Sequence, residues 1–342
     1  MQTKKTKKKL FKAKKKLPIV TEKTKKTHII VWFDLFLMIC LILFFILFFF
    51  NPGDSLYVRL FSSIKKSSVL KIHKKILSIP VVNKYTAPLV SAGAVYIIDL
   101  ESATPLYAKQ EHIHFLPAST TKIITALTAY DQFKLNAILT VKRVITEGQV
   151  VGFVQGEKVT FENILYGLLV HSGNDAAYVL ADNYPGGYDQ FVIDMNKKAQ
   201  SLHMKNSRFI NPAGLDASGQ YVTAFDLSLA GRKLLQNEEL AKIVSTKSIT
   251  ISDTTFAHFH PLNNVNKLLG EIPGIGGLKT GYTLEAKENL VTFYTHNDHE
   301  YMIVILKSED RFEDTRTLVN WLQYAIKYKT VTIEDTLPVK QE

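Results

Sequence analysis

The sequence is poor in cysteine, with Cys40 the only one among its 342 residues. A single thiol cannot form a disulfide within the chain, so stability must come from a packed core rather than from cross-links. Internal repeats are absent, and the only low-complexity segment is a lysine-rich N-terminus, so nothing supports a repeat architecture. Hydrophobic residues make up 46% and charged residues 21%, as in globular proteins that bury a sizeable core.

Acidic residues are almost missing from the N-terminus. Residues 1–27 hold twelve lysines against one acidic residue, Glu22, so much of the net charge of +11 lies in this tail. Blocks of like charge are typical of solvated arms rather than of folded binding surfaces. The basic composition therefore does not predict a nucleic-acid partner.

A complete set of metal ligands is also lacking. His112 and His114 form one His-x-His pair, and His258 and His260 form another. No carboxylate or thiol pattern completes either pair, so both are better explained as surface or loop histidines. We therefore expect neither a metal nor a cofactor.

One long apolar run is present at residues 29–50, interrupted only by Asp34. As a helix it spans about 33 Å, close to the hydrocarbon thickness of a bilayer, and Asp34 lies near one end of it. A cleaved signal peptide has a shorter apolar region followed by small residues, which this run lacks. We expect an uncleaved transmembrane signal anchor, with the lysine tail (residues 1–28) in the cytoplasm and the chain after residue 50 outside the cell membrane.

The remaining chain divides into a stalk, a folded domain and a short tail. Residues 51–88 are basic with scattered apolar residues and predict a partly helical extracytoplasmic stalk; an amphipathic segment on the membrane surface is the alternative. Residues 89–330 are the expected catalytic domain, and residues 331–342 are a C-terminal tail.

Hydrophobic patterning within the domain predicts strands at both ends and helices between them. Strands are expected at 92–100, 105–109, 277–282, 290–295 and 301–307, mostly helix over 119–236, and a last helix over 312–327. This order predicts an α/β fold of the α+β type, in which helices flank an antiparallel sheet built from both chain ends. A helical subdomain is inserted between the two groups of strands.

Ser119 and Lys122 stand three residues apart in the segment PASTTKIITALTAY. Pro117 and the apolar run that follows indicate a helix that begins at Ser119, and residues i and i+3 of a helix share a face. A lysine amine held in a water-poor pocket near other cations can lose its charge and accept the serine proton. Taken alone, the motif is more simply explained by a serine that caps a helix.

Two further short motifs follow. Ser172 and Asn174 flank a glycine in LLVHSGNDAA, where a hydroxyl and a carboxamide on a tight turn can relay a proton and hold a carbonyl group. Lys279, Thr280 and Gly281 lie in GGLKTGYT, where glycines bracket a strand and allow a ligand to approach its backbone. Taken singly, the first is an ordinary connection between helices and the second an exposed edge strand.

The order of the three motifs indicates a function. Ser-x-x-Lys, Ser-x-Asn and Lys-Thr-Gly, on a helix start, an interhelical turn and a strand, form the signature shared by penicillin-binding proteins and class A β-lactamases. The segments FLPASTTK, GEKVTFENILYGLLVHSGNDAA, NPAGLD, TAFDL and GLKTGYT extend the match over residues 91–328. The chain resembles the D-alanyl-D-alanine carboxypeptidases, the low-molecular-mass penicillin-binding proteins of peptidase family S11.

The resemblance implies a fold like that of penicillin-binding proteins and a role for each motif residue. Ser119 would be the nucleophile that attacks the peptide bond between two D-alanines of a peptidoglycan stem peptide. Lys122 would be its general base, Ser172 would relay a proton to the leaving amine, and Lys279 would polarise Ser172. β-Lactam antibiotics would acylate the same serine covalently.

Substrate binding is implied for the remaining motif positions. Asn174 would hold the amide of the donor peptide, and Thr280, Gly281 and Tyr282 belong to the strand that binds the substrate. Thr280, with a later arginine, would hold the terminal carboxylate. The backbone N–H groups of Ser119 and Tyr282 would form the oxyanion hole.

Arg311, in the segment SEDRFED, is the arginine expected at that carboxylate; a surface ion pair with Glu309 or Glu313 is the alternative. The sequence departs from the family pattern at residues 286–289, which read Ala-Lys-Glu-Asn where the family usually has Ala-Gly and then a short residue. We expect a remodelled turn there. Only a short tail follows residue 327, so the C-terminal β-rich domain and amphipathic anchor of many members are also expected to be missing.

Three other functions are alternatives to a D-alanyl-D-alanine carboxypeptidase. A β-lactamase is disfavoured because no Glu-x-x-Leu-Asn segment lies between Asn174 and Lys279 and the central motif is Ser-Gly-Asn. A non-catalytic wall-binding module is disfavoured because no motif residue is lost. A peptidoglycan DD-endopeptidase of the same fold stays open, since the motifs do not separate it from a carboxypeptidase.

Overall fold

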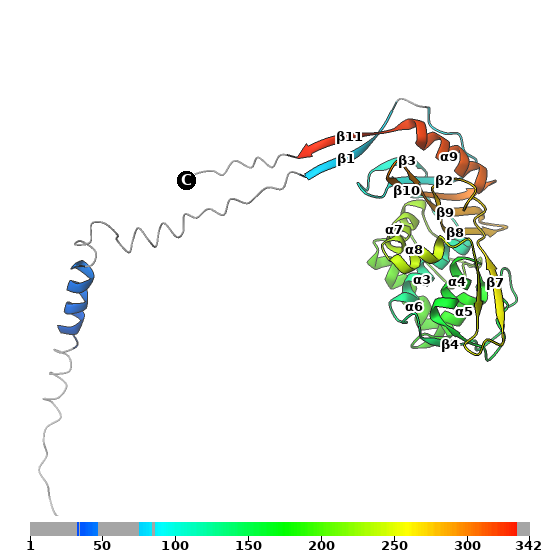
Figure 1. Ribbon diagram of the computed structural model, residues 1–342, viewed down its shortest axis with the longest axis horizontal. Helices are drawn as coiled ribbons and strands as arrows, with labels where there is room; N and C mark the ends of the chain where they lie inside the picture. The colour runs from blue at the N-terminus through cyan, green and yellow to red at the C-terminus, as the bar shows by residue number, and fades with distance from the viewer. Residues whose placement is uncertain (1–32, 34, 47–74, 84–85, 334–342) are drawn as a thin grey trace, which may run out of the picture. The chain divides into compact units, whose positions relative to one another are not determined.

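The computed structural model describes residues 33, 35–46, 75–83 and 86–333 (Figure 1). The chain divides into two compact units, Met1–His73 and Lys74–Glu342. In the first unit the backbone of residues 35–46 is helical. No helix within the described ranges is long and apolar enough to cross a membrane. The anchor expected at residues 29–50 extends outside those ranges on both sides, and the lysine tail lies wholly outside them.

The second unit is built on a five-stranded antiparallel sheet in the order β3-β2-β10-β9-β8. The strands are β2 (Ala94–Asp99), β3 (Pro105–Lys109), β8 (Ile275–Thr283), β9 (Lys287–His296) and β10 (His299–Ser308). Strands from the two ends of the domain meet where β2 pairs with β10, with Tyr301 opposite Asp99 and Leu306 opposite Ala94. The expected sheet built from both chain ends is therefore present.

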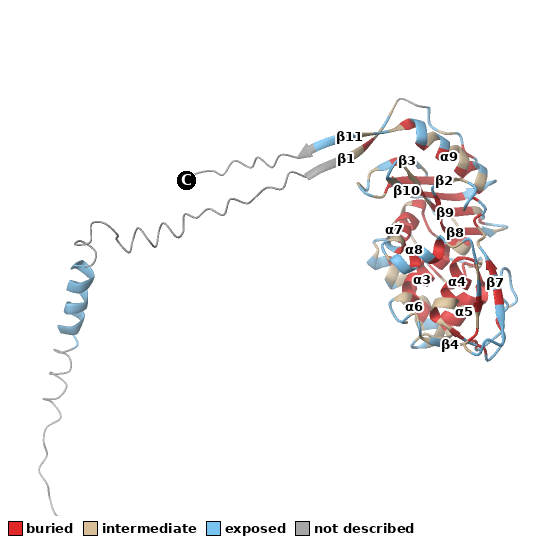
Figure 2. Cartoon of the chain, viewed as in Figure 1, coloured by how far each residue is buried: buried red, intermediate tan, exposed pale blue. Residues whose placement is uncertain are grey.

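Both faces of this sheet are buried. Successive side chains of a strand point to opposite faces, and those on each face belong to a hydrophobic cluster. On β2, Ala94, Tyr96 and Ile98 join one hydrophobic cluster, and Val95 and Ile97 join the other. A strand covered on both faces reads as a continuous apolar run rather than an alternating one. Figure 2 shows this sheet as a buried layer between the α9 helix (Arg311–Ala325) and the helices on its other side.

Within the described part of this unit, a helical region lies on one face of the sheet and a single helix lies on the other (Figure 1). The first face packs against a helical region formed by α3 (Lys122–Tyr130), α4 (Phe161–Leu169), α5 (Asn174–Asn183), α6 (Gly187–Ser201), α7 (Ala224–Leu235) and α8 (Glu238–Val244). The second face packs against α9 (Arg311–Ala325), through Leu318, Val319 and Leu322. The helical region is inserted between β3 and β8, as the sequence predicts.

Three small sheets complete the unit. β4 (Ile138–Thr140) pairs with β5 (Lys158–Thr160), β6 (Ser248–Ser252) pairs with β7 (Phe259–Asn263), and β1 (Lys75–Val82) pairs with β11 (Ile326–Ile333). All three pairs are antiparallel.

These small sheets correct three expectations from the sequence. The mostly helical stretch expected over 119–236 contains β4, β5 and long loops. The described part of the expected stalk is not helical, since residues 75–82 form a strand, and residues 331–333 of the expected tail belong to β11 rather than to a tail. β1 and β11 become strands by pairing with each other across most of the chain, a contact that local patterning does not reveal.

Candidate active site

Ser119 lies at the junction between the sheet and the helical region. It belongs to a short 3-10 helix, η1 (Ala118–Thr121), which runs directly into α3. The α-helix thus begins at Lys122, three residues later than the sequence predicts. The backbone before the serine is strained, because Ala118 has a φ of 46°, a left-handed value that non-glycine residues rarely adopt.

Lys122 is fully buried and its amine has three hydrogen-bond partners. Nζ lies 2.9 Å from Ser119 Oγ, 2.7 Å from Asn174 Oδ1 and 2.7 Å from the carbonyl oxygen of Ala213. Burial lowers the pKa of Lys122 from 10.5 to about 7, although the nearby carboxylate of Asp175 acts in the opposite direction. Much of this lysine is therefore uncharged near neutral pH.

The three partners of Lys122 fit an uncharged amine. A neutral amine has two N–H donors and one lone pair, whereas the oxygens of Asn174 and Ala213 can only accept. The ammonium form donates to all three oxygens; in the uncharged form the two remaining N–H groups bond to Asn174 and Ala213, and the lone pair faces the hydroxyl of Ser119, 2.9 Å away. In this arrangement Ser119 donates its proton toward Lys122, as a nucleophile does to its base.

Ser172 and Asn174 lie on the turn between α4 and α5. Ser172 is buried and adopts a φ of 66°, a second left-handed backbone conformation at the site. Asn174 begins α5, and its Nδ2 donates to the carbonyl oxygen of Glu147 at 2.7 Å. The carboxamide thus links the base Lys122 to the loop at Glu147. The sequence did not indicate this link.

The Lys-Thr-Gly motif lies on β8, the edge strand next to η1. Lys279 is buried and its Nζ donates to the carbonyl oxygen of Thr280 at 3.0 Å. Burial, followed by the charges of Lys122 and Arg311, lowers the pKa of Lys279 well below its usual value. Between the described side chains of Lys279 and Ser172 there is no hydrogen bond, so the polarisation expected from the resemblance is not a direct contact here.

Gly281 lets the edge strand approach the nucleophile closely. A Cβ atom at this position would lie 3.1 Å from the backbone nitrogen of Ser119 and 3.1 Å from the carbonyl oxygen of Pro117. A side chain would therefore push β8 away from Ser119. The contact brings the backbones of β8 and η1 together at the position expected for the oxyanion hole.

A cavity of about 300 Å³ opens at these residues. Gly148, Gln149 and Val265 line it, which the sequence did not indicate. The rest of its lining consists of six positions predicted from the sequence: Ser119, Ser172, Thr280, Gly281, Tyr282 and Arg311. A larger hollow of about 560 Å³ lies at Arg143, Tyr178 and Asp182, but Arg143 and Asp182 already pair with each other at 2.9 Å. The smaller cavity is the one whose lining includes Ser119, which lies beside a buried base, so we assign the chemistry to it.

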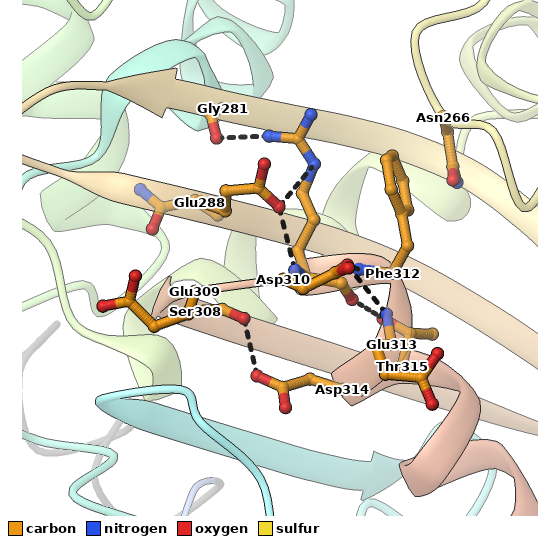
Figure 3. A network of polar contacts seen from close by, with 12 residues as sticks. Asn266, Gly281, Glu288, Ser308, Glu309, Asp310, Phe312, Glu313, Asp314 and Thr315 are labelled. Carbon is orange, nitrogen blue, oxygen red and sulfur yellow. Dashed lines mark hydrogen bonds and ion pairs between the residues drawn. The ribbon is translucent and has the colours of Figure 1, made fainter.

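Arg311 reaches the cavity from the first turn of α9. Its Nη1 donates to the carbonyl oxygen of Gly281 at 2.8 Å, and the guanidinium carbon lies 4.9 Å from the ring centre of Phe312. The side chain faces Glu288, with Nε 3.9 Å from Oε2, and not Glu309 or Glu313. The alternative of a surface ion pair is therefore wrong, because Arg311 is buried and its acidic neighbour comes from β9 (Figure 3).

Asn289 is a further site residue that the sequence did not indicate. It is fully buried on β9, and its Nδ2 donates to the carbonyl oxygens of Leu116 at 2.9 Å and Pro117 at 3.0 Å. It therefore fixes the segment that leads into Ser119. The turn before it is a tight hairpin in which Thr283 pairs with Lys287, and Lys287 takes a left-handed φ of 57°.

Two of the four histidines in the His-x-His pairs have a carboxylate partner, and one of them is His112, whose Nε2 lies 3.7 Å from Glu111 Oε1 at the surface. His260 Nε2 lies 2.8 Å from Glu157 Oε1, and both side chains are buried. His114 instead stacks on Tyr221, with ring centres 4.2 Å apart. Within the described ranges, no three histidine, cysteine, aspartate or glutamate side chains gather as a metal site would require.

A serine beside a buried lysine, between an antiparallel sheet and an inserted helical region, is the arrangement of a serine acyl-transfer site. The family model for D-alanyl-D-alanine carboxypeptidases, peptidase family S11, matches residues 81–310. The chain belongs to this family, as the motifs predict.

Curated relatives agree with this assignment. The D-alanyl-D-alanine carboxypeptidase DacF of Bacillus subtilis is 31% identical over 247 residues, which cover 70% of this chain and 63% of the relative. The carboxypeptidase DacD of Escherichia coli is 33% identical over 254 residues, covering 69% and 64%. The chain therefore matches a little under two thirds of the length of these relatives.

A solved structure supports the same fold. The crystal structure of the Streptomyces K15 DD-transpeptidase aligns with a TM-score of 0.65 and 29% identity, covering 69% of this chain and 98% of that one. This bears out the predicted fold like that of penicillin-binding proteins.

Proposed function

We propose that the protein is a serine-type D-alanyl-D-alanine carboxypeptidase that removes the terminal D-alanine from peptidoglycan stem peptides. The observation that carries this proposal is the buried amine of Lys122, with Nζ 2.9 Å from Ser119 Oγ, beside a cavity whose lining includes Ser119, Ser172, Thr280 and Gly281. The family and the printed names of its relatives support the same activity.

In the acylation step, Lys122 accepts the proton of Ser119 as Oγ attacks the carbonyl carbon of the penultimate D-alanine. The negative charge that develops on the carbonyl oxygen faces the backbone N–H groups of Ser119 and Tyr282. When the tetrahedral intermediate collapses, the C–N bond breaks, and the proton that Lys122 took from Ser119 passes through Ser172 to the leaving amine, so Lys122 is again uncharged. D-alanine departs, and the peptide stays on Ser119 as an ester.

In the second step, water attacks the ester and returns the proton to Ser119 Oγ through Lys122. Arg311 and Thr280 bind the terminal carboxylate of the substrate before the first step, and that carboxylate leaves with D-alanine. β-Lactams acylate the same serine, because opening of their strained amide follows the same attack. A carboxypeptidase and an endopeptidase of this family would use the same site residues and differ in the peptide that occupies the cavity. An endopeptidase that cleaves cross-links therefore remains the second candidate.

We also propose that residues 29–50 anchor the protein in the cell membrane, with the N-terminus in the cytoplasm and the catalytic domain outside. The length and composition of this apolar run and the lysines before it support the proposal. This topology would place the catalytic domain on the same side of the membrane as the peptidoglycan on which it is proposed to act.

Labelling with a fluorescent penicillin tests the catalytic assignment. The full chain, in membranes or detergent, should be labelled covalently, and the Ser119→Ala variant should not. Ser201→Ala, on the exposed end of α6, is the matched control and should label like the unchanged protein. Label on the Ser119→Ala variant would refute the assignment. A second assay compares D-alanine release from a pentapeptide with cleavage of a cross-linked dimer, and so separates a carboxypeptidase from an endopeptidase.

A further inference from the structure

The turn that departs from the family pattern places an extra carboxylate beside the proposed carboxylate-binding arginine. Glu288, in this turn, accepts a hydrogen bond from the backbone N–H of Arg311 at 2.9 Å through Oε2. The same oxygen lies 3.9 Å from Arg311 Nε. Figure 3 shows Glu288 and Gly281 on one side of this network and Phe312 on the other.

The contacts of the guanidinium show that Glu288 acts on it mainly as a charge. Nη1 is used by the carbonyl oxygen of Gly281 at 2.8 Å. Nε is buried without a hydrogen-bond partner, since 3.9 Å is too long for a hydrogen bond to Glu288. The carboxylate is nevertheless held in place by its bond to the backbone N–H of Arg311. Glu288 is therefore a fixed negative charge next to Arg311.

A substrate carboxylate bound to Arg311 would be a second anion on the same guanidinium. Two carboxylates that share one cation repel each other, so the first weakens the binding of the second. The side chain of Glu288 is 28% exposed, which screens this repulsion in part without removing it. A neutral group in place of the substrate carboxylate would not experience it.

We propose that Glu288 is a specificity-determining residue, which limits how strongly Arg311 favours substrates that end in a free carboxylate. The inference rests on the proposed function, because it assigns Arg311 to the terminal carboxylate. Glu288 acts through Arg311 and does not contact the reacting atoms. It makes the site more tolerant of substrates whose terminal group is uncharged.

The test compares two substrates that differ only in terminal charge. One is an acylated L-Lys-D-Ala-D-Ala peptide, and the other is the same peptide with a C-terminal carboxamide. In Glu288→Gln the bond from the Arg311 N–H is kept and the charge is lost. The ratio of kcat/KM for the carboxylate to that for the carboxamide should rise about threefold to fivefold. The rise should come from a lower KM for the carboxylate, with kcat unchanged.

Two variants control for structural effects. Glu288→Asp keeps the charge and should keep the ratio near that of the unchanged protein. Glu285→Gln removes the same charge from an exposed position of the same turn and should leave the ratio unaltered. An unchanged ratio in Glu288→Gln, or an equal rise in Glu285→Gln, would overturn the inference. Absence of penicillin label on Ser119 in the unchanged protein would instead overturn the proposed function and this inference with it.

Discussion

At the scale of single residues, the burial of Lys122 decides the chemistry. An ammonium group loses its hydration on burial, and here no carboxylate pairs with it directly, so the neutral form is favoured. Asn174 and Ala213 accept from the amine without offering a negative charge, which orients the lone pair and leaves the pKa low. The site thus combines a base with a pKa near physiological pH and a nucleophile within hydrogen-bond distance.

The acylation rate should therefore follow the ionisation of Lys122. Its pKa is lowered to about 7, and only the unprotonated amine can accept the proton of Ser119. The second-order rate constant for acylation by benzylpenicillin should rise as pH increases, with a midpoint at about 7, and then level off. Stopped-flow measurements of this rate constant at pH values below and above the midpoint check the prediction. A rate constant that does not change through this midpoint would show that Lys122 is not the base.

Asn174 offers a way to move that midpoint. In Asn174→Asp the new carboxylate would lie about where Oδ1 now accepts from Lys122 Nζ at 2.7 Å. An anion at that distance stabilises the ammonium form, so the pKa of Lys122 should rise. At pH 7 acylation should then slow by about tenfold or more, and the midpoint of the pH profile should shift upward by at least about one unit. A slower reaction with an unmoved midpoint would mean that Asn174 acts on the substrate rather than on Lys122.

Local spacing explains which site residues the sequence could predict. Ser119 and Lys122 are three residues apart on one helical segment, so their contact follows from helix geometry. The partner oxygen of Ala213 and the carboxylate of Glu288 come from segments that the fold brings together. Strand register and loop paths place such partners, and neither is encoded in a short window of sequence.

At the scale of elements, Asp314 joins the two ends of the catalytic domain. Its carboxylate accepts from the backbone N–H groups of Ser91 at 2.8 Å and Ala92 at 2.9 Å, and from the hydroxyls of Ser91 at 2.8 Å and Ser308 at 2.6 Å. α9 is thereby fixed to the segment just before β2 and to the end of β10, and Figure 3 shows the bond to Ser308. Because Arg311 lies one turn earlier on α9, the same bonds hold it at the cavity.

Removal of this carboxylate should destabilise the domain. Asp314→Ala leaves two backbone N–H groups and two hydroxyls without their acceptor, which should cost about 2–4 kcal/mol in the free energy of unfolding. Thermal unfolding should show Tm lowered by roughly 5–10 °C. Glu313→Ala, at an exposed position on the same helix, is the matched control and should change Tm little. Equal effects of the two substitutions would refute the role given to Asp314.

The individual strands of the central sheet could be predicted from the sequence, because each is an apolar run of strand length bounded by turn residues. β8, β9 and β10 lie where the sequence predicts strands, within a few residues at each end. β1 and β11 were missed because they read as polar or mixed segments, KILSIPVV and IKYKTVTI, and become strands by pairing with each other. The pair β6 and β7 was missed for the same reason, since half of its side chains are exposed.

At the scale of the whole molecule, the catalytic unit and the apolar run at residues 29–50 serve different parts of one proposed role. In the proposed role, the first would act on wall peptides, and the second would keep it at the outer face of the membrane. Because Cys40 is the only cysteine, the membrane topology can be mapped by introducing one thiol at a time into a Cys40→Ser background. Ser201 is exposed on α6 of the catalytic unit, and Lys14 lies in the lysine tail.

A membrane-impermeant maleimide added to intact protoplasts should label the Ser201→Cys protein at once. The Lys14→Cys protein should be labelled only after detergent opens the membrane, because twelve lysines before the apolar run favour a cytoplasmic N-terminus. Fluorescent penicillin should bind both proteins, which shows that each is folded. Labelling of Lys14→Cys in intact protoplasts, with Ser201→Cys protected, would reverse the topology. The proposed action on peptidoglycan would then be untenable, because its substrate would lie across the membrane from Ser119.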